Sequence, residues 1–249
     1  MKKFTPIILF LIIIFLITSC NSSAPDPASS QNSETGIGNG DVPDYTNLQL
    51  EASQQTYRFE PSAEGSMNGS YAFEVTNTSD VPLQVESYAV DFLDQEENVV
   101  SHNENVNLIP KIMQPGEKAY AGDIVNIEAP ANPDDIKKMK VYLYSSKTSK
   151  VLEMFDFDNL NLMENTDGGS LIVTGKVTNN TSSDAELVSI AVVSMGENNK
   201  LLDVTYVSSI FTLSRGAESS FETKLNNSTL KKADIKNIYA LGYDFTKTN

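Results

Sequence analysis

The sequence predicts an all-β protein in which two tandem β-sandwich domains follow a signal peptide and a disordered tether. Three observations predict this fold: short stretches of alternating apolar and polar residues, turn-forming residues between them, and an internal repeat about 100 residues long. A repeat of this length is too long for a solenoid and matches the size of one sandwich domain. No long stretch has the apolar period of an α-helix.

Residues 1–19 have the pattern of a signal peptide. Lys2 and Lys3 form a basic start, and an unbroken apolar run extends from 7 to 17. A membrane-spanning helix needs ~20 apolar residues, so this shorter run is better explained as the apolar part of a cleaved signal. An uncleaved membrane anchor is the alternative interpretation.

Cys20 is the only cysteine in the sequence, and it comes just after this apolar run. One aliphatic and two small residues precede it: Ile17, Thr18 and Ser19. This pattern resembles the lipobox of bacterial lipoproteins. The resemblance implies cleavage before Cys20, a diacylglyceryl group on its sulfur, and a protein that this lipid holds on the extracytoplasmic side of the cell membrane. A single cysteine also excludes an intrachain disulfide, so an apolar core has to stabilise the fold.

We expect residues 20–46 to be a disordered tether. They are rich in Ser, Asn, Pro and Gly and contain few residues that a core would bury. A flexible chain of this length has an end-to-end distance of about 30 Å. That distance is enough to hold folded domains away from a membrane surface.

The charge of the chain excludes one class of partner. The formal net charge is −15, so the protein repels the phosphates of nucleic acids and we expect no nucleic-acid binding. The simplest interpretation of this charge is solubility, and a basic partner is the alternative. Hydrophobic residues make up 40% and charged residues 20% of the chain, which is typical of a globular protein.

The internal repeat divides the rest of the chain into two predicted domains, 47–148 and 149–249. Matching residues recur at offsets that drift from 102 to 99, as short loop deletions would produce. The matches are 75–77 (Val-Thr-Asn) with 177–179, Ser87 with Ser189, Ala89 with Ala191, Val90 with Val192, Gly116 with Gly216, 135–137 (Asp-Ile-Lys) with 234–236, and Tyr144 with Tyr243.

The elements of the first copy follow from local patterns in chain order. Tyr71, Phe73 and Val75 alternate with other residues and predict a half-buried strand, which a turn of short polar residues ends. The later elements are a strand through Tyr88 and Val90, a turn at 95–98, a strand from 99, a turn at 115–116 and a helical turn at 133–137 before the last strand. The second copy repeats them with strands through Val173, Gly175 and Val177 and through Ile190 and Val192, turns at 179–182, 196–199 and 215–216, and a helical turn at 230–234.

The first copy resembles a known small domain. A strand ending in Val-Thr-Asn, a long strand through 90–94 into an acidic turn, Val-Val at 99–100 and Pro-Gly-Glu at 115–117 resemble the FxLYD-type domain. This resemblance covers about 70–145 and 170–245 and implies immunoglobulin-like sandwiches of the kind found in bacterial lipoproteins and surface proteins. The second copy departs from the pattern at 194–196 and Arg215. The family has no catalytic residues to carry over.

The acidic turn is the one candidate for a metal site. Asp94, Glu96 and Glu97 offer oxygen ligands of the kind that calcium prefers, although their spacing does not match an EF-hand loop. A solvated acidic hairpin is the favoured interpretation. His102 is the only histidine, so neither a zinc site nor a Ser–His pair of the usual kind is expected.

These features predict a non-catalytic, membrane-anchored surface lipoprotein that acts as an interaction or spacer module in the cell envelope. Its expected partners are the membrane, through a lipid on Cys20, and an unknown envelope or extracellular protein; no cofactor is expected. Two alternatives stay open. One is a ligand- or calcium-binding lipoprotein. The other is a hydrolase of envelope polymers, which would need two carboxylates across a cleft.

Overall fold

The computed structural model describes residues 49–62, 66–128, 132–165, 170–207 and 211–248. The predicted signal peptide, the lipobox residues Ile17 to Cys20 and the tether lie outside these residues. Throughout the described ranges the chain forms antiparallel strands and short 3-10 helices, which confirms the all-β prediction. None of the helices in these ranges is long and apolar enough to cross a membrane.

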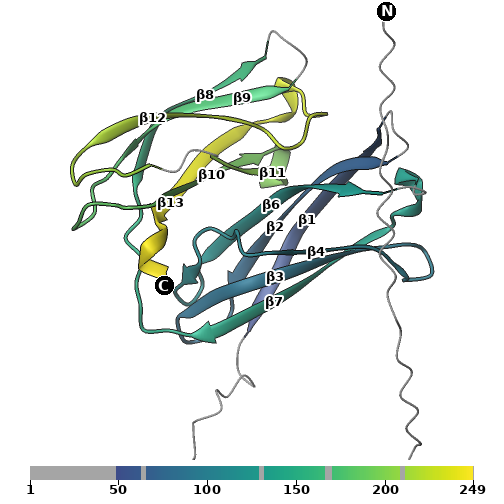
Figure 1. Ribbon diagram of the computed structural model, residues 1–249, viewed down its shortest axis with the longest axis horizontal. Coiled ribbons are helices and arrows are strands. Elements are labelled where there is room, and N and C mark those ends of the chain that lie inside the picture. Colours follow the sequence, from purple (N-terminus) through teal and green to yellow (C-terminus); the bar gives the residue numbers. More distant parts are fainter. Residues whose placement is uncertain (1–48, 63–65, 129–131, 166–169, 208–210, 249) are drawn as a thin grey trace, which may run out of the picture. The chain divides into compact units, whose positions relative to one another are not determined.

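The strands fall into two series along the chain (Figure 1). The first series is β1 (Leu50–Pro61), β2 (Met67–Asn77), β3 (Leu83–Leu93), β4 (Val99–Asn105), β5 (Ile112–Met113), β6 (Lys118–Ile127) and β7 (Lys138–Lys147). The second series is β8 (Asp156–Glu164), β9 (Leu171–Thr178), β10 (Val188–Met195), β11 (Leu201–Tyr206), β12 (Glu218–Lys224) and β13 (Asn237–Asp244). The 3-10 helices are η2 (Pro133–Asp135), η3 (Glu197–Asn199), η4 (Lys232–Asp234) and η5 (Phe245–Thr248).

These strands form four antiparallel sheets. Sheet A has the order β1-β2-β6, and in sheet B the central strand β3 pairs with β4, β5 and β7. Sheet C has the order β11-β10-β13, and sheet D has the order β12-β9-β8. One apolar core lies between sheets A and B and another between sheets C and D, so each series forms a β-sandwich.

Strand pairing gives the two sandwiches the same plan. Sheets A and D occupy equivalent places in it, and so do sheets B and C. The described residues nevertheless belong to one compact unit, because the two sandwiches also share a buried contact. The domain ranges 47–148 and 149–249 therefore stay a prediction.

A buried asparagine holds the turn between β2 and β3. Asn77 is fully buried, and its Nδ2 donates to the carbonyl oxygens of Val81 at 2.9 Å and Met113 at 3.0 Å. Its Oδ1 accepts from Ser79 N at 3.0 Å and from Ser79 Oγ at 2.6 Å. Its backbone oxygen accepts from Gly116 N at 2.8 Å. One side chain therefore ties two separate turns of the sandwich together.

The second sandwich repeats these bonds one for one. Asn179 is also fully buried, and its Nδ2 donates to the carbonyl oxygens of Ser183 at 3.0 Å and Leu213 at 2.7 Å. Its Oδ1 accepts from Thr181 N at 3.1 Å and Thr181 Oγ1 at 2.6 Å, and its backbone oxygen accepts from Gly216 N at 2.6 Å. The repeated Val-Thr-Asn sequence is thus the start of a repeated hydrogen-bonded turn.

The predicted glycine turns and helical turns are confirmed. Gly116 and Gly216 have φ values of 80° and 77°, in the left-handed region that favours glycine. The predicted helical turns are the 3-10 helices η2 and η4. In each of them an aspartate, Asp135 or Asp234, accepts a hydrogen bond from the backbone N–H three residues earlier.

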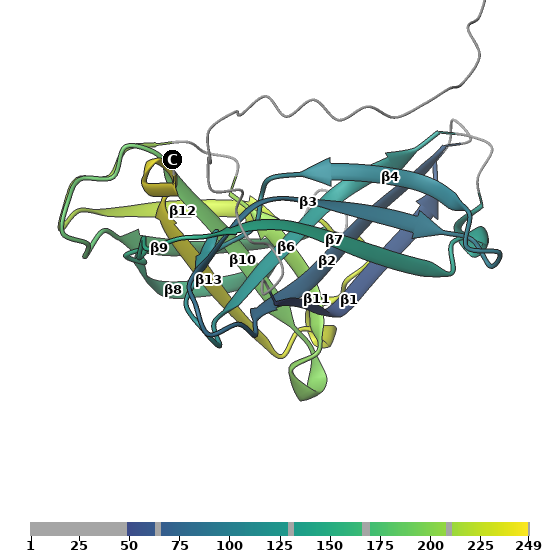
Figure 2. The ribbon, with the colours of Figure 1, turned by 90° about the horizontal axis from the view of Figure 1, so that it is seen from below.

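The contact between the sandwiches is a face-to-face packing of sheet A on sheet C, with their strands running across the middle of Figures 1 and 2. Ala72 and Tyr120 of sheet A are buried against Ala191, Val193 and Val204 of sheet C. Sheet C of the second sandwich is the equivalent of sheet B of the first. The contact therefore joins unlike faces, because sheet A of the first sandwich packs on the sheet of the second that is not its own equivalent.

This contact corrects one prediction. Tyr71, Phe73 and Val75 face the core of the first sandwich as expected, but Ala72 and Glu74 on the opposite face are only 1% and 3% exposed. The prediction that this strand is half-buried was wrong because sheet C covers its outer face.

Polar bonds fix one end of the contact. A bulge in β1 between Ser53 and Thr56 gives Gln54 a φ of 47°. Gln54 Nε2 donates to Glu74 Oε2 at 3.3 Å, and Gln54 Oε1 accepts from the backbone N–H of Leu201 at 2.9 Å. Lys118 Nζ lies 2.7 Å from the other oxygen of Glu74. The bulge therefore lets one side chain join the two sandwiches and satisfy a buried carboxylate.

Replacing Asn179 with alanine is expected to lower the free energy of unfolding by about 2–3 kcal/mol, because the variant loses the hydrogen bonds of this buried side chain to Ser183, Leu213 and Thr181. Urea denaturation measures the loss. Asn161→Ala is the control, since Asn161 is exposed on β8 and its side chain has no hydrogen bond within the described residues. Equal losses in the two variants would contradict the role of the turn.

Replacing Gly122 with alanine is expected to destabilise the protein by about 1–3 kcal/mol, the usual cost of overpacking. A Cβ on Gly122 would lie 2.5 Å from the carbonyl oxygen of Val204, so sheets A and C would have to separate. Thermal unfolding measures the effect. The control is Glu222→Ala, at the equivalent but exposed place on sheet D. An unchanged midpoint for Gly122→Ala would show that the sheets are not in close contact.

Candidate functional site

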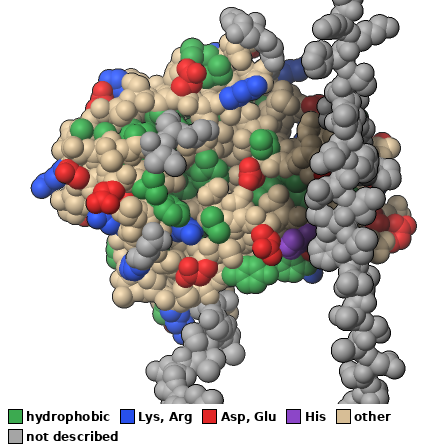
Figure 3. Space-filling view, in the orientation of Figure 1, with side chains coloured by type: hydrophobic (Ala, Val, Ile, Leu, Met, Phe, Trp, Pro, Cys, Tyr) green, Lys and Arg blue, Asp and Glu red, His purple; other side chains and the backbone are tan. Residues whose placement is uncertain are grey.

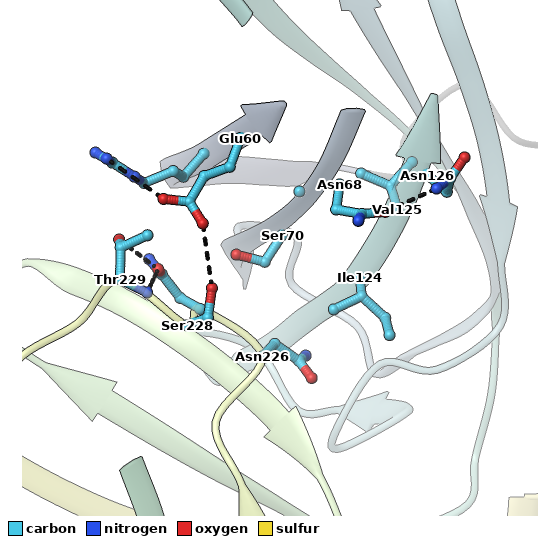
Figure 4. Close-up of a pocket in the computed structure, with 12 residues that line it drawn as sticks. Glu60, Asn68, Ser70, Ile124, Val125, Asn126, Asn226, Ser228 and Thr229 are labelled. Atoms are coloured by element: carbon cyan, nitrogen blue, oxygen red, sulfur yellow. Dashed lines mark hydrogen bonds and ion pairs between the residues drawn. The ribbon is translucent and has the colours of Figure 1, made fainter. Parts of the chain in front are cut away.

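The candidate site is a cleft of about 320 Å³ beside the contact of sheets A and C (Figure 4). The outer face of sheet A forms its floor, with residues from β1, β2 and β6. The loop 226–229, between β12 and η4, forms its roof. Sheet C covers the middle of the outer face of sheet A, and this cleft lies at one end of the covered part.

The floor carries a pair of amides on neighbouring strands. Asn68 of β2 and Asn126 of β6 are register partners, and Asn126 Nδ2 donates to Asn68 Oδ1 at 2.7 Å. Both residues are exposed. Ser70 and Ile124 lie next to this pair, and Ile124 is 62% exposed. The floor therefore combines hydrogen-bonding groups with an apolar surface.

Hydrogen bonds hold the roof in one conformation. The backbone N–H of Asn226 donates to Asp203 Oδ2 at 3.1 Å and to Thr205 Oγ1 at 2.8 Å, and Asn226 Nδ2 donates to the carbonyl of Val204 at 3.0 Å. Thr229 donates twice to Asn227 Oδ1, from its N at 3.1 Å and its Oγ1 at 2.8 Å. The loop is thus organised before any ligand arrives.

Asp203 lies behind this roof and is the most unusual titratable group of the site. It is 1% exposed, and burial raises the pKa of its carboxyl to about 6, although hydrogen bonds from Thr205 and the backbone of 226–227 oppose the shift. Its charged form is therefore costly at neutral pH, and the loop bonds compensate for part of that cost.

The charges at the rim of the cleft are paired. Arg58 Nη2 lies 3.9 Å from Glu60 Oε1, and Ser228 Oγ lies 3.5 Å from Glu60 Oε2. These contacts are drawn as dashed lines in Figure 4. Glu60 is the only carboxylate among the described residues that line the cleft.

The acidic turn lies elsewhere, between β3 and β4. Asp94 accepts from Asn98 N at 2.8 Å and from Asn98 Nδ2 at 2.9 Å, and these bonds hold the pKa of Asp94 below its usual value. Glu97 bonds to Lys138 at 2.9 Å, which lowers the pKa of Glu97, and Glu96 is exposed. In the described part of the chain, no three acidic, histidine or cysteine side chains are grouped as metal ligands.

His102 belongs to a charged group on the outer face of sheet B. Its Nδ1 lies 2.6 Å from Asp91 Oδ1, and its Nε2 lies 3.4 Å from Glu104 Oε1. These hydrogen bonds raise the pKa of His102. Lys140 is the register partner of Asp91 on the other side. In Figure 3 the purple histidine side chain lies at the surface beside acidic side chains.

The sequence analysis did not single out the amides of the cleft as a site. Asn227 forms a turn in which its side chain accepts two hydrogen bonds from Thr229. Asparagine is uncommon in β-strands, so the presence of Asn68 and Asn126 within two strands was a signal in the sequence that these residues could have a role beyond the fold. Their meeting across β2 and β6 depends on strand register, which no local pattern reports.

Comparisons with known proteins add little to this geometry. No family model matches the chain, and no curated protein matches it. A solved structure described as ApaA from Bordetella pertussis has 16% identity and a TM-score of 0.26, over 68% of this chain and 94% of its own. Red sea bream transglutaminase has 10% identity and a TM-score of 0.21, over 74% of this chain and 27% of its own. The tandem CBM22 domains of Paenibacillus barcinonensis Xyn10C have 9% identity and a TM-score of 0.13, over 83% of this chain and 91% of their own. TM-scores this low carry no argument about function.

Replacing Asp203 with asparagine is expected to remove a pH dependence of stability. The folded state holds this proton up to about pH 6 and the unfolded state only to about pH 4, so the wild type loses stability as the pH rises through this window. The stability of Asp203→Asn relative to wild type should therefore increase from pH 4 to pH 7, by on the order of 3 kcal/mol.

Urea denaturation of both proteins at several pH values measures this difference. The other carboxyl groups are the same in both proteins, so their contributions to the pH dependence of stability cancel in the comparison. A difference between the two proteins that stays constant with pH would contradict the raised pKa of Asp203.

Proposed function

We propose that this protein is a non-catalytic, lipid-anchored interaction module on the extracytoplasmic side of the cell membrane. The observation that carries the proposal is the N-terminal sequence, in which a basic start and an apolar run lead to Ile17-Thr18-Ser19-Cys20. A diacylglyceryl group on Cys20 would hold the protein at the membrane. Residues 21–46 would act as the tether to the first strand, which begins at Leu50.

The structure of the two sandwiches supports a role in binding rather than simple spacing. Their buried contact gives the cleft a fixed floor and a fixed roof. Amides and hydroxyls, which form hydrogen bonds to ligands, dominate the lining of the cleft. General acid–base catalysis uses groups that titrate near neutral pH, and Asp203, whose pKa is about 6, is buried behind the roof and is not part of the lining. The one carboxylate of the lining, Glu60, is bonded to Arg58 and Ser228. This arrangement fits an interaction module that has a preformed binding surface.

Intact-mass analysis of membrane fractions tests the anchor. The wild type should lack residues 1–19 and carry a diacylglyceryl adduct, and Cys20→Ala should lose both the adduct and the membrane association. Ser22→Ala is the matched control and should keep the lipid. A wild-type protein that retains its N-terminus, or that is released without lipid, would overturn the proposal.

Protease treatment of intact spheroplasts tests the side of the membrane. The sandwiches should be degraded from outside while a cytoplasmic marker stays intact. Full protection of the protein under these conditions would place it on the other side.

A further inference from the structure

The cleft contains four amides with unused hydrogen-bonding groups, two on its floor and two in its roof. Asn68 Oδ1 and Asn126 Nδ2 are bonded to each other, and Asn227 Oδ1 is bonded to Thr229. Asn226 Nδ2 is bonded to the carbonyl of Val204. The remaining atoms are Asn68 Nδ2, Asn126 Oδ1, Asn226 Oδ1 and Asn227 Nδ2, and none of them has a hydrogen-bond partner among the residues that the structure describes. The cleft therefore offers one donor and one acceptor from its floor and one of each from its roof.

This combination suits a hydroxyl group better than an ion. A hydroxyl both donates and accepts, so a ligand with several hydroxyls can bond to the donor Asn68 Nδ2 and also to the acceptor Asn126 Oδ1. An anion would find an unpaired acceptor beside the donors, and a cation would face two amide donors. Arg58 and Glu60 add no net charge because they pair with each other.

The apolar part of the lining points to the same chemistry. Ile124 is 62% exposed next to the amides, so its side chain is open to contact with a ligand. A sugar ring presents a hydroxylated edge and a face of C–H groups, so its edge would meet the amides while its face covers Ile124. The volume of about 320 Å³ lies at the lower end of the range of ligand pockets, and the open shape admits a chain of rings.

We propose that the cleft between sheet A and the loop 226–229 binds an uncharged glycan, with Asn68, Asn126 and Asn227 as its hydrogen-bonding residues and Ile124 as its apolar contact. This goes beyond the proposed function, because the cleft does not depend on a lipid at Cys20. Loss of lipidation would leave glycan binding intact, and loss of glycan binding would leave the anchor intact.

The test is a titration of the full chain, purified in detergent, with neutral oligosaccharides: chitotetraose, cellotetraose, maltotetraose and xylotetraose. Tetragalacturonate is the charged comparison and tetraalanine the peptide comparison. Isothermal calorimetry measures affinity, and amide chemical shifts of Asn68, Asn126 and Asn227 locate the ligand. At least one neutral tetrasaccharide should bind and shift these signals.

Asn68→Asp tests the assignment of the donor, because it keeps the shape of the side chain and replaces Nδ2 with an oxygen. Its affinity should fall about tenfold, in line with the loss of one hydrogen bond. Asn161→Asp makes the same change on the exposed strand β8 and should bind as tightly as the wild type. Circular dichroism confirms that both variants fold.

Three results would overturn the proposal. The first is that no neutral saccharide of the panel binds at millimolar concentration. The second is binding that Asn68→Asp and Asn161→Asp weaken equally. The third is that tetragalacturonate or tetraalanine binds the cleft while the neutral saccharides do not.

Discussion

The packing of sheet A on sheet C is the constraint on which the rest of this structure depends. It needs small residues on both faces, and it has them in Ala72, Gly122 and Ala191. Sheets approach each other to the distance of a core only where side chains are short or interlock. The cleft depends on this approach, because one sandwich supplies its floor and the other its roof. A change that separates the sheets therefore alters the cleft even when its lining is intact.

The parts of the fold that local chemistry determines were predictable from the sequence. Asn77 and Asn179 end their strands in turns, because an asparagine side chain can bond the backbone that follows it. The glycines at 116 and 216 mark positions with positive φ for an equally local reason. Repetition strengthened these predictions, because the same residues appeared twice at nearly one offset.

The parts that depend on contacts distant in sequence were not predictable. Nothing next to Glu74 in the sequence indicates that Gln54 and Lys118 enclose it. The same is true of the cleft, where residues near 68 and 126 meet a loop near 227. The alternation of β2 identified its inner face correctly, but alternation cannot show whether another sheet covers the outer face.

The contact between the sandwiches joins unlike faces, and this has a consequence for assembly. A head-to-tail contact of this kind has no built-in end, so identical units would go on stacking into a fibre. Here the outermost layers resemble the end caps of a repeat protein. Sheet B has Asp91, His102 and Lys140 at the places where sheet C has Val193, Val204 and Tyr239. Sheet D has Thr174 and Glu222 where sheet A has Ala72 and Gly122. A third layer would have to desolvate those charged and polar side chains, which disfavours further stacking.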